Sequence, residues 1–172
     1  MRSIHLTLAL VLALIVGVAC SNRANTMSYG DNVKKALEQA ELKDVTVAED
    51  RDKNTITLGG KVHSENAKQQ AGEVAQATAG NRIVANEISV QPVGAESAAR
   101  NIAENVDDAI EKNYKAALIS KGLDKNIRFN SKNGVITLKG RVQTPQQKQE
   151  AQEIATNIPN VQQVLNELQV RR

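Results

Sequence analysis

The chain has 172 residues, of which 41% are hydrophobic and 24% charged, and this balance argues against disorder throughout. Only 2% are aromatic, namely Tyr29, Tyr114 and Phe129, so few rings are available to stack on the bases of single-stranded nucleic acid. The formal net charge of +3 is also too small for a strong polyanion binder, and we therefore expect no nucleic-acid partner.

The N-terminal end has the pattern of a secretory signal peptide. Arg2 supplies a positive start, and residues 6–19 form an apolar run dominated by Leu, Val, Ala and Ile. This run is shorter than the roughly twenty residues that a membrane-spanning helix needs. We therefore expect residues 1–19 to be removed as a signal peptide.

Residues 16–20 (VGVAC) resemble a bacterial lipobox, in which the cysteine is diacylated and becomes the first residue after cleavage. Gly17 departs from the usual larger aliphatic residue, and Gly17 with Ala19 would also suit the ordinary signal peptidase. That alternative would leave one unpaired thiol in an oxidising compartment. We therefore expect lipidation at Cys20, a tether over residues 20–29 and a periplasm-facing, membrane-anchored lipoprotein. Ser21, which is not the Asp that retains such proteins in the inner membrane, favours the outer membrane.

The elements of the first folded segment follow from its hydrophobic pattern. Residues 31–42 have hydrophobic residues at steps of three and four, which predicts a helix. Strands are predicted over 45–49 and 55–62, because hydrophobic and polar residues alternate there on either side of a turn-rich segment. A helix opening at Ser64 and an alternating strand over 83–90 complete the order αββαβ.

The same order returns after a linker that is predicted at residues 92–98. A helix carries Ile110, Tyr114, Ala117 and Leu118, and strands over 127–130 and 135–142 surround an Asn-Gly turn. A further helix begins with Thr144 as a cap, Pro145 at the first position and Gln147 completing a capping box, and the last strand is predicted over 161–170.

The two segments are copies of one unit. Residues 55–62 (TITLGGKV) recur eighty residues later as 135–142 (VITLKGRV), and 84–90 (VANEISV) recur as 164–170 (VLNELQV) without a gap. Each copy is predicted to have an α+β fold, a three-stranded mixed sheet with two helices on one face. The predicted domains cover residues 30–91 and 99–172.

Gly60 and Gly140 occupy the same place in the two copies, where a strand ends. Glycine at such a point permits a bend or the close approach of a helix, so we expect both to be structural. A phosphate-binding loop would need more glycines at defined spacing before a helix.

The double αββαβ unit, with its TITLGGKV and VITLKGRV strands, resembles the BON domain, which occurs in pairs in exported bacterial envelope-stress proteins. The resemblance covers about residues 30–170. The strand glycine of that family corresponds to Gly60 and Gly140, and V-x-N-E-[IL]-x-V matches its last strand. The resemblance implies a non-catalytic module linked to phospholipid binding and envelope integrity, without a cofactor.

Groups that could carry out catalysis are few. His5 lies in the predicted signal peptide, which leaves His63 as the only other histidine, and Cys20 is the only cysteine. A catalytic triad or a histidine-based metal site cannot be assembled from this set. We therefore expect neither an enzyme nor a metal site.

The segment from Lys112 to Lys132 combines cations with hydrophobic residues, which suits the surface of an anionic membrane. Our candidate lipid contacts there are Lys112, Lys115, Leu118, Ile119, Lys121, Lys125 and Arg128. An alternative interpretation is structural, because lysines near the end of a helix match its dipole and Tyr114 with Leu118 suit a core.

A second possible function is that of an adaptor for an envelope protein partner. Its contact faces would be the polar, Gln-rich segments 68–70 (KQQ) and 146–149 (QQKQ), which also carry lysines.

Overall fold

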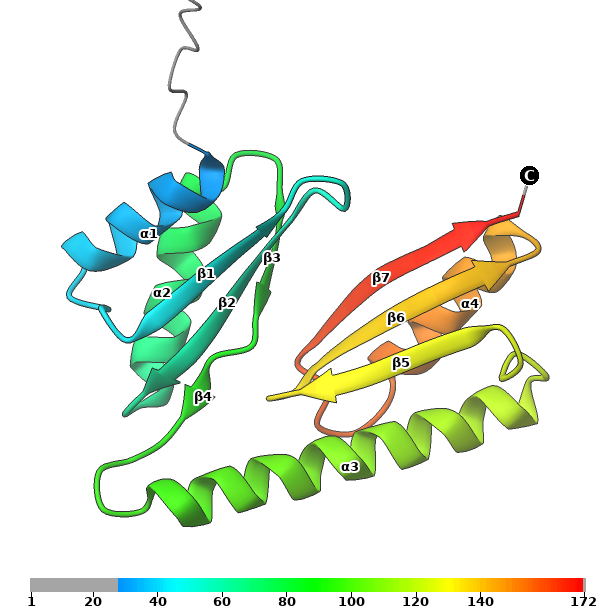
Figure 1. Cartoon of the computed structure of the whole chain (residues 1–172). Helices are drawn as coiled ribbons and strands as arrows, with labels where there is room; N and C mark the ends of the chain where they lie inside the picture. The colour runs from blue at the N-terminus through cyan, green and yellow to red at the C-terminus, as the bar shows by residue number, and fades with distance from the viewer. Residues whose placement is uncertain (1–27, 172) are drawn as a thin grey trace, which may run out of the picture.

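The computed structural model describes residues 28–171 (Figure 1). The predicted signal peptide and Cys20 lie outside these residues, as does most of the predicted tether. The first repeat consists of α1 (Tyr29–Gln39), β1 (Val45–Asp50), β2 (Thr55–Val62), α2 (Glu65–Thr78), β3 (Ile83–Asn86) and β4 (Ser89–Val90). The second consists of α3 (Glu96–Ser120), β5 (Ile127–Lys132), β6 (Val135–Val142), α4 (Pro145–Thr156) and β7 (Gln163–Val170).

Both repeats have the predicted α+β fold. In each, the hairpin strands pair antiparallel, and the last strand runs parallel to the middle one, giving the orders β1-β2-β3 and β5-β6-β7. The helices cover one face of each sheet, and the other face carries no helix (Figure 1). The strand predicted over 83–90 is interrupted between β3 and β4, where the Glu87 carbonyl accepts a hydrogen bond from Asn133 in the second repeat.

The first helix has other limits than predicted, and the third begins inside the predicted linker. The first helix starts at Tyr29, because Ser28 and Asp31 form a capping box, and it ends at Gln39, before Glu41 takes a positive φ of 61°. The third helix starts at Glu96, so residues 96–98 of the predicted linker are helical. This 25-residue helix runs along one side of both repeats, from the end of β4 to the loop before β5 (Figure 1).

Each repeat encloses its own hydrophobic core. The two cores use equivalent residues, since Ile56, Leu58, Ala71 and Ala75 of the first match Ile136, Leu138, Ala151 and Ala155 of the second, and all eight are fully buried. Tyr114 fills the second core, where its hydroxyl donates to the Ala151 carbonyl at 3.1 Å and its ring meets Phe129 edge to face. Burial raises the pKa of Tyr114 well above its usual range.

Gly60 and Gly140 are required by the backbone of the sheets. Their φ angles are +87° and +126°, which residues with a side chain rarely adopt. A Cβ atom on either would collide with the carbonyl oxygen of Asp44 or Asn126, just before the neighbouring strand. The close neighbour is thus a backbone carbonyl and not a helix, so the close helix approach that we considered is wrong.

The two domains meet through reciprocal ion pairs. Glu87 binds Lys132 of the second domain at 3.2 Å, and Glu167 binds Lys53 of the first at 3.1 Å. Both glutamates are largely buried, with side chains 14% and 13% exposed. Each lysine lies next to or within the hairpin turn of its own domain, so each domain presents its turn to the last strand segment of the other.

Side-chain amides and a buried lysine complete this interface. Gln163 bridges the edge of β3, since its side chain donates to the Val84 carbonyl and accepts from the Asn86 N–H. Lys68 is only 8% exposed and donates to the Asn133 carbonyl and to Gln162 Oε1, both at 3.2 Å. Burial lowers the pKa of Lys68. A small apolar cluster formed by Ala85, Val135 and Leu165 fills the contact.

Candidate functional site

Four of the candidate lipid contacts lie on α3 with different exposures, namely Lys112, Lys115, Leu118 and Ile119. Lys112 and Lys115 are exposed, and Ile119 is 55% exposed. Acidic residues accompany them, because Asp108 and Glu111 each lie four positions before one of the lysines and therefore on the same side of the helix. The exposed side of α3 thus carries both signs of charge.

The assignment of Leu118 as a lipid contact was wrong. Its side chain is fully buried in the second core, four residues after Tyr114, so the structural interpretation of this pair is correct. Lys121, which follows the helix, lies 3.8 Å from Glu150 of α4. It is therefore partly neutralised on the helical side of the domain.

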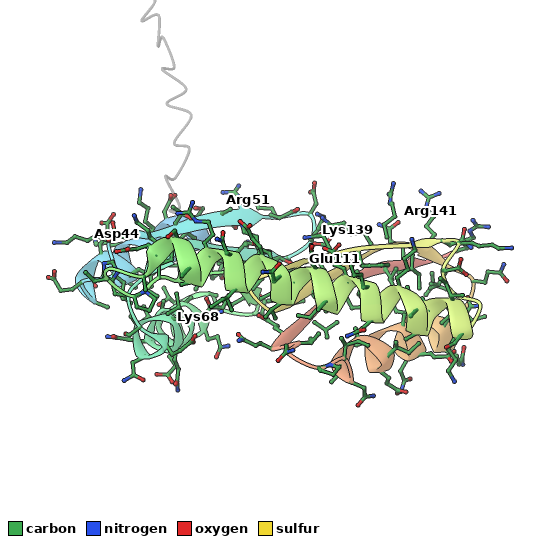
Figure 2. The ribbon with its side chains drawn as sticks, turned by 90° about the horizontal axis from the view of Figure 1, so that it is seen from below. Asp44, Arg51, Lys68, Glu111, Lys139 and Arg141 are labelled. Atoms are coloured by element: carbon green, nitrogen blue, oxygen red, sulfur yellow. The ribbon has the colours of Figure 1, made fainter. Side chains whose placement is uncertain are left out.

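Lys125 and Arg128 lie together beside the uncovered face of the second sheet, where they line one cleft. Two cations of β6 that we had not selected join them. Arg128 stands directly opposite Lys139 in the register of β5 and β6, and Arg141 follows on the same face of β6. Figure 2 shows Lys139 and Arg141 projecting from the side of the molecule opposite α2 and α4.

A signal for these two cations was present in the alternation of β6. Ile136 and Leu138 are fully buried under the helices, so Lys139 and Arg141 must point to the other face. Their charge is uncompensated: within residues 28–171, no carboxylate lies within 4.0 Å of Lys125, Arg128, Lys139 or Arg141. We call these four residues the basic sheet face.

One carboxylate borders the basic sheet face but is engaged elsewhere. Glu167 of β7 stands opposite Lys139 in the strand register, yet its ion pair is with Lys53 of the first domain. The pKa of Lys53 is raised above its usual value, chiefly because its ammonium group donates a hydrogen bond to Glu167 and next because it donates to Asp50. Lys53 therefore remains a cation while it holds Glu167.

The basic sheet face forms one wall of a cleft of about 800 Å³ between the domains. The first domain supplies the other wall with Asp52, Lys53, Thr55 and Ile83, and Ile83 is 50% exposed. Lys148 of α4 adds a further cation at the edge of β7. Among the described residues, the charged side chains that line the cleft are six cations and two carboxylates, Asp52 and Glu167, so the cleft has a net positive charge, with an exposed hydrophobic side chain in its lining.

Among residues 28–171, His63 is the only histidine. His63 is exposed, and its Nδ1 lies 2.9 Å from the Gln91 carbonyl oxygen. Across the described part of the chain, no three Asp, Glu, His or Cys side chains gather as metal ligands would. No helix between residues 28 and 171 combines the length and the apolar character of a membrane span.

The two polar segments proposed as contact faces of an adaptor, 68–70 and 146–149, have side chains that are already engaged within the protein. Lys68 is buried against the second domain and so cannot serve on a free contact surface. Gln69 and Gln149 each donate to a glutamate four residues later, Glu73 and Glu153, at 2.9 Å. Thr144 caps α4 as predicted, because its side chain accepts from the Gln147 N–H. The predicted capping box is not formed, because the Gln147 side chain accepts from the N–H of Gln143 and not from that of Thr144.

Comparison with known proteins places this arrangement in context. The chain is 26% identical over 142 residues to osmotically-inducible protein Y of Escherichia coli strain K12, a match covering 81% of this chain and 69% of that protein. Two solved structures of CdsD, a structural protein of the type III secretion system of Chlamydia trachomatis, are similar at 11% and 10% identity with TM-scores of 0.36. The first match, to the C-terminal domain of CdsD, covers 82% of this chain and 96% of that one, and the second covers 81% and 90%. At this level the likeness to CdsD says nothing about function.

The sequence model of the BON domain matches residues 30–92 and 99–172, and the chain therefore belongs to the BON domain family, with two copies in tandem.

Proposed function

We propose that this chain is a non-catalytic envelope protein that binds anionic phospholipid surfaces through its second BON domain and supports envelope integrity under osmotic stress. The observation that carries the proposal is the basic sheet face, which is exposed on a face that no helix covers. Its cations have no carboxylate partners among the described residues. An anionic surface would supply the missing negative charge.

The magnitude of this attraction suits reversible membrane binding. A lysine or arginine near an anionic bilayer contributes about 1 kcal/mol, so several together give useful affinity when the protein is already held near the membrane. The attraction falls off over a Debye length of about 8 Å at physiological salt. Binding should therefore require close contact and weaken as salt rises.

Two further considerations support an envelope role. The similar protein from Escherichia coli is named for induction by osmotic stress, and the BON resemblance implies phospholipid binding.

We also propose that Cys20 is lipidated and holds the first domain close to the membrane, with the outer membrane as the favoured location. Such an anchor would raise the local concentration of the second domain at the bilayer surface.

Flotation with liposomes tests the proposed function. The fragment from residue 28 onward, which contains both cores and lacks Cys20, is mixed with neutral or anionic vesicles at low and at physiological salt. We expect it to float with anionic vesicles only, and less at the higher salt. If it floats with neither, the proposal of membrane binding by the domains fails, and the adaptor function becomes the better explanation.

The anchor is tested separately in cells of an expressing bacterium. Metabolic labelling with a palmitate analogue should mark the full-length chain, and the Cys20→Ser variant should lose the label. Fractionation of inner and outer membranes then tests the address. Labelling that survives in Cys20→Ser would contradict lipidation at this residue.

A further inference from the structure

Three cations are forced together on the second sheet. Arg128 and Lys139 are opposite each other on neighbouring strands, and Arg141 follows two residues later on the same face. Like charges directly opposite in a sheet are destabilising. Such a departure from local stability is typical of a functional site, where a ligand supplies the compensating charge.

The first domain draws away the carboxylate that could balance the positive charge of this cluster. Glu167 is the residue opposite Lys139 on β7, and it would be the natural partner of that lysine. Instead the Lys53 ammonium group lies 3.1 Å from Glu167 Oε2, and the Glu167 side chain is only 13% exposed. Lys53 thus holds the carboxylate that would otherwise neutralise Lys139.

We propose that Arg128, Lys139 and Arg141 bind the phosphate group of an anionic phospholipid headgroup in the interdomain cleft, and that Lys53 keeps this site available by holding Glu167. The inference rests on the proposed function, which it deepens by naming the binding group and its regulator. Arginine guanidinium groups offer paired donors that match phosphate oxygens, and Lys139 adds a point charge between them.

The surroundings of the cluster favour a headgroup that is still part of a membrane. The cleft of about 800 Å³ is large enough for a glycerophosphate group. Lys139 and Arg141, which line the cleft, project from the side of the molecule opposite α2 and α4, so a flat surface can approach them (Figure 2). Ile83, which is half exposed at the border, offers a hydrophobic contact beside the charged wall.

The first experiment compares variants of the fragment from residue 28 onward on vesicles of phosphatidylglycerol and phosphatidylcholine. Lys139→Gln with Arg141→Gln should weaken binding by about fivefold for each cation removed. A matched control, Lys34→Gln with Lys35→Gln, removes two exposed cations of α1 and should change binding little. Circular dichroism during heating confirms that both variants fold.

A second pair of variants separates this site from the exposed side of α3. Lys112→Gln with Lys115→Gln removes the same charge from the helix and should weaken binding less than the change on β6. If the α3 variant loses binding and the β6 variant keeps it, the headgroup site is wrong while membrane binding stands. If the wild-type fragment binds no anionic vesicle, the proposed function itself fails.

The role of Lys53 is tested by a double-mutant cycle with Glu167. Glu167→Gln should strengthen binding, and Lys53→Gln should weaken it by more than the roughly fivefold expected for the loss of one cation, because it also releases Glu167. In the Glu167→Gln background, Lys53→Gln should cost no more than about fivefold, because the carboxylate that Lys53 restrains is gone. Equal losses in both backgrounds would show that Lys53 acts only through its own charge, and would overturn the regulatory part.

Competition identifies the source of the phosphate. Soluble glycerophosphate and inorganic phosphate are added at millimolar concentration to fragment bound to phosphatidylglycerol vesicles, at constant ionic strength. We expect little displacement, because the membrane presents many headgroups together and adds a hydrophobic contact. Full release by inorganic phosphate would mean that the cleft takes free phosphate, and would overturn the headgroup assignment.

Discussion

Glu87 and Glu167 occupy the same position in the two repeats, and each forms an ion pair with a lysine of the other domain. Eighty residues separate them, which is the offset of the internal repeat. The interface therefore has an approximate two-fold relationship that the duplication itself supplies. Because both carboxylates are largely buried, these pairs should contribute to the coupling of the domains more than ordinary surface pairs do.

This reciprocity predicts a measurable interaction between Glu87 and Lys132. In a cycle of Glu87→Gln, Lys132→Gln and the double variant, we expect a coupling energy of about 0.5–1 kcal/mol in the free energy of unfolding by urea. The coupling should decrease at high salt. A value indistinguishable from zero at low salt would contradict a stabilising role for this pair.

Leu118 and Ile119 are adjacent residues whose substitution should have very different effects. Leu118→Ala removes a fully buried side chain and should lower the free energy of unfolding by about 2–5 kcal/mol. Ile119→Ala changes a side chain that is 55% exposed, so its effect should stay within about 0.5 kcal/mol. Urea denaturation of the two variants checks this. Similar losses would mean that the assignment of the buried side of α3 is wrong.

Gly140→Ala should destabilise the second domain beyond the cost of a positive φ. The control is Gly122→Ala, where φ is +68° and nothing lies within 4 Å of an added Cβ. A left-handed backbone alone costs about 1–2 kcal/mol for a residue with a side chain. Gly140→Ala adds a collision with the Asn126 carbonyl, so its loss in thermal stability should exceed that of the control. Equal losses would contradict this account.

Glu49 should make the first domain sensitive to acid. Its carboxylate accepts a hydrogen bond from the Gly30 N–H at 3.1 Å and lies 2.8 Å from Arg82. The pKa of Glu49 is lowered, chiefly because of the Gly30 hydrogen bond, against the opposing effect of desolvation. A lowered pKa in the folded state gives stability that is present above the unfolded-state pKa and is lost as pH falls through the folded-state pKa.

The Glu49→Gln variant should therefore be less stable than the wild type at pH 7, and the difference should shrink at acidic pH. Melting temperatures of both proteins between pH 7 and pH 3 measure this. A difference that stays constant over the whole range would show that the carboxylate charge does not contribute.

The fold could be predicted because the same pattern of hydrophobic residues occurs in both copies of the repeat, so each copy supports the interpretation of the other. Alternation in 55–62 and 135–142 identified the central strands, and the Thr144 and Pro145 signals located the start of α4. The shared surface of the candidate lipid contacts was harder to predict, because residues 112–132 pass from helix to loop to strand. Leu118 and Arg128 share a segment of sequence but not a surface.

The interface between the domains could not be predicted from local patterns. Lys53 and Glu167 are far apart in the chain, and no periodicity connects them. Lys139 and Arg141 could have been placed on the outer face of the sheet from alternation alone. What could not be known is that their neighbour Glu167 is held by the other domain.

Lys68 and Lys148 occupy the same position in the two repeats but differ in exposure and in the groups that they contact. Lys68 is 8% exposed and fastened to two acceptors of the other domain, whereas Lys148 lines the open cleft. In a symmetric dimer of two identical single-repeat chains, the two equivalent lysines would have the same environment, so both would be buried in the interface or both would be accessible. Joining the copies in one polypeptide removes this constraint. The lysine of the first copy can then stabilise the interface, while the lysine of the second copy remains accessible to a ligand in the cleft.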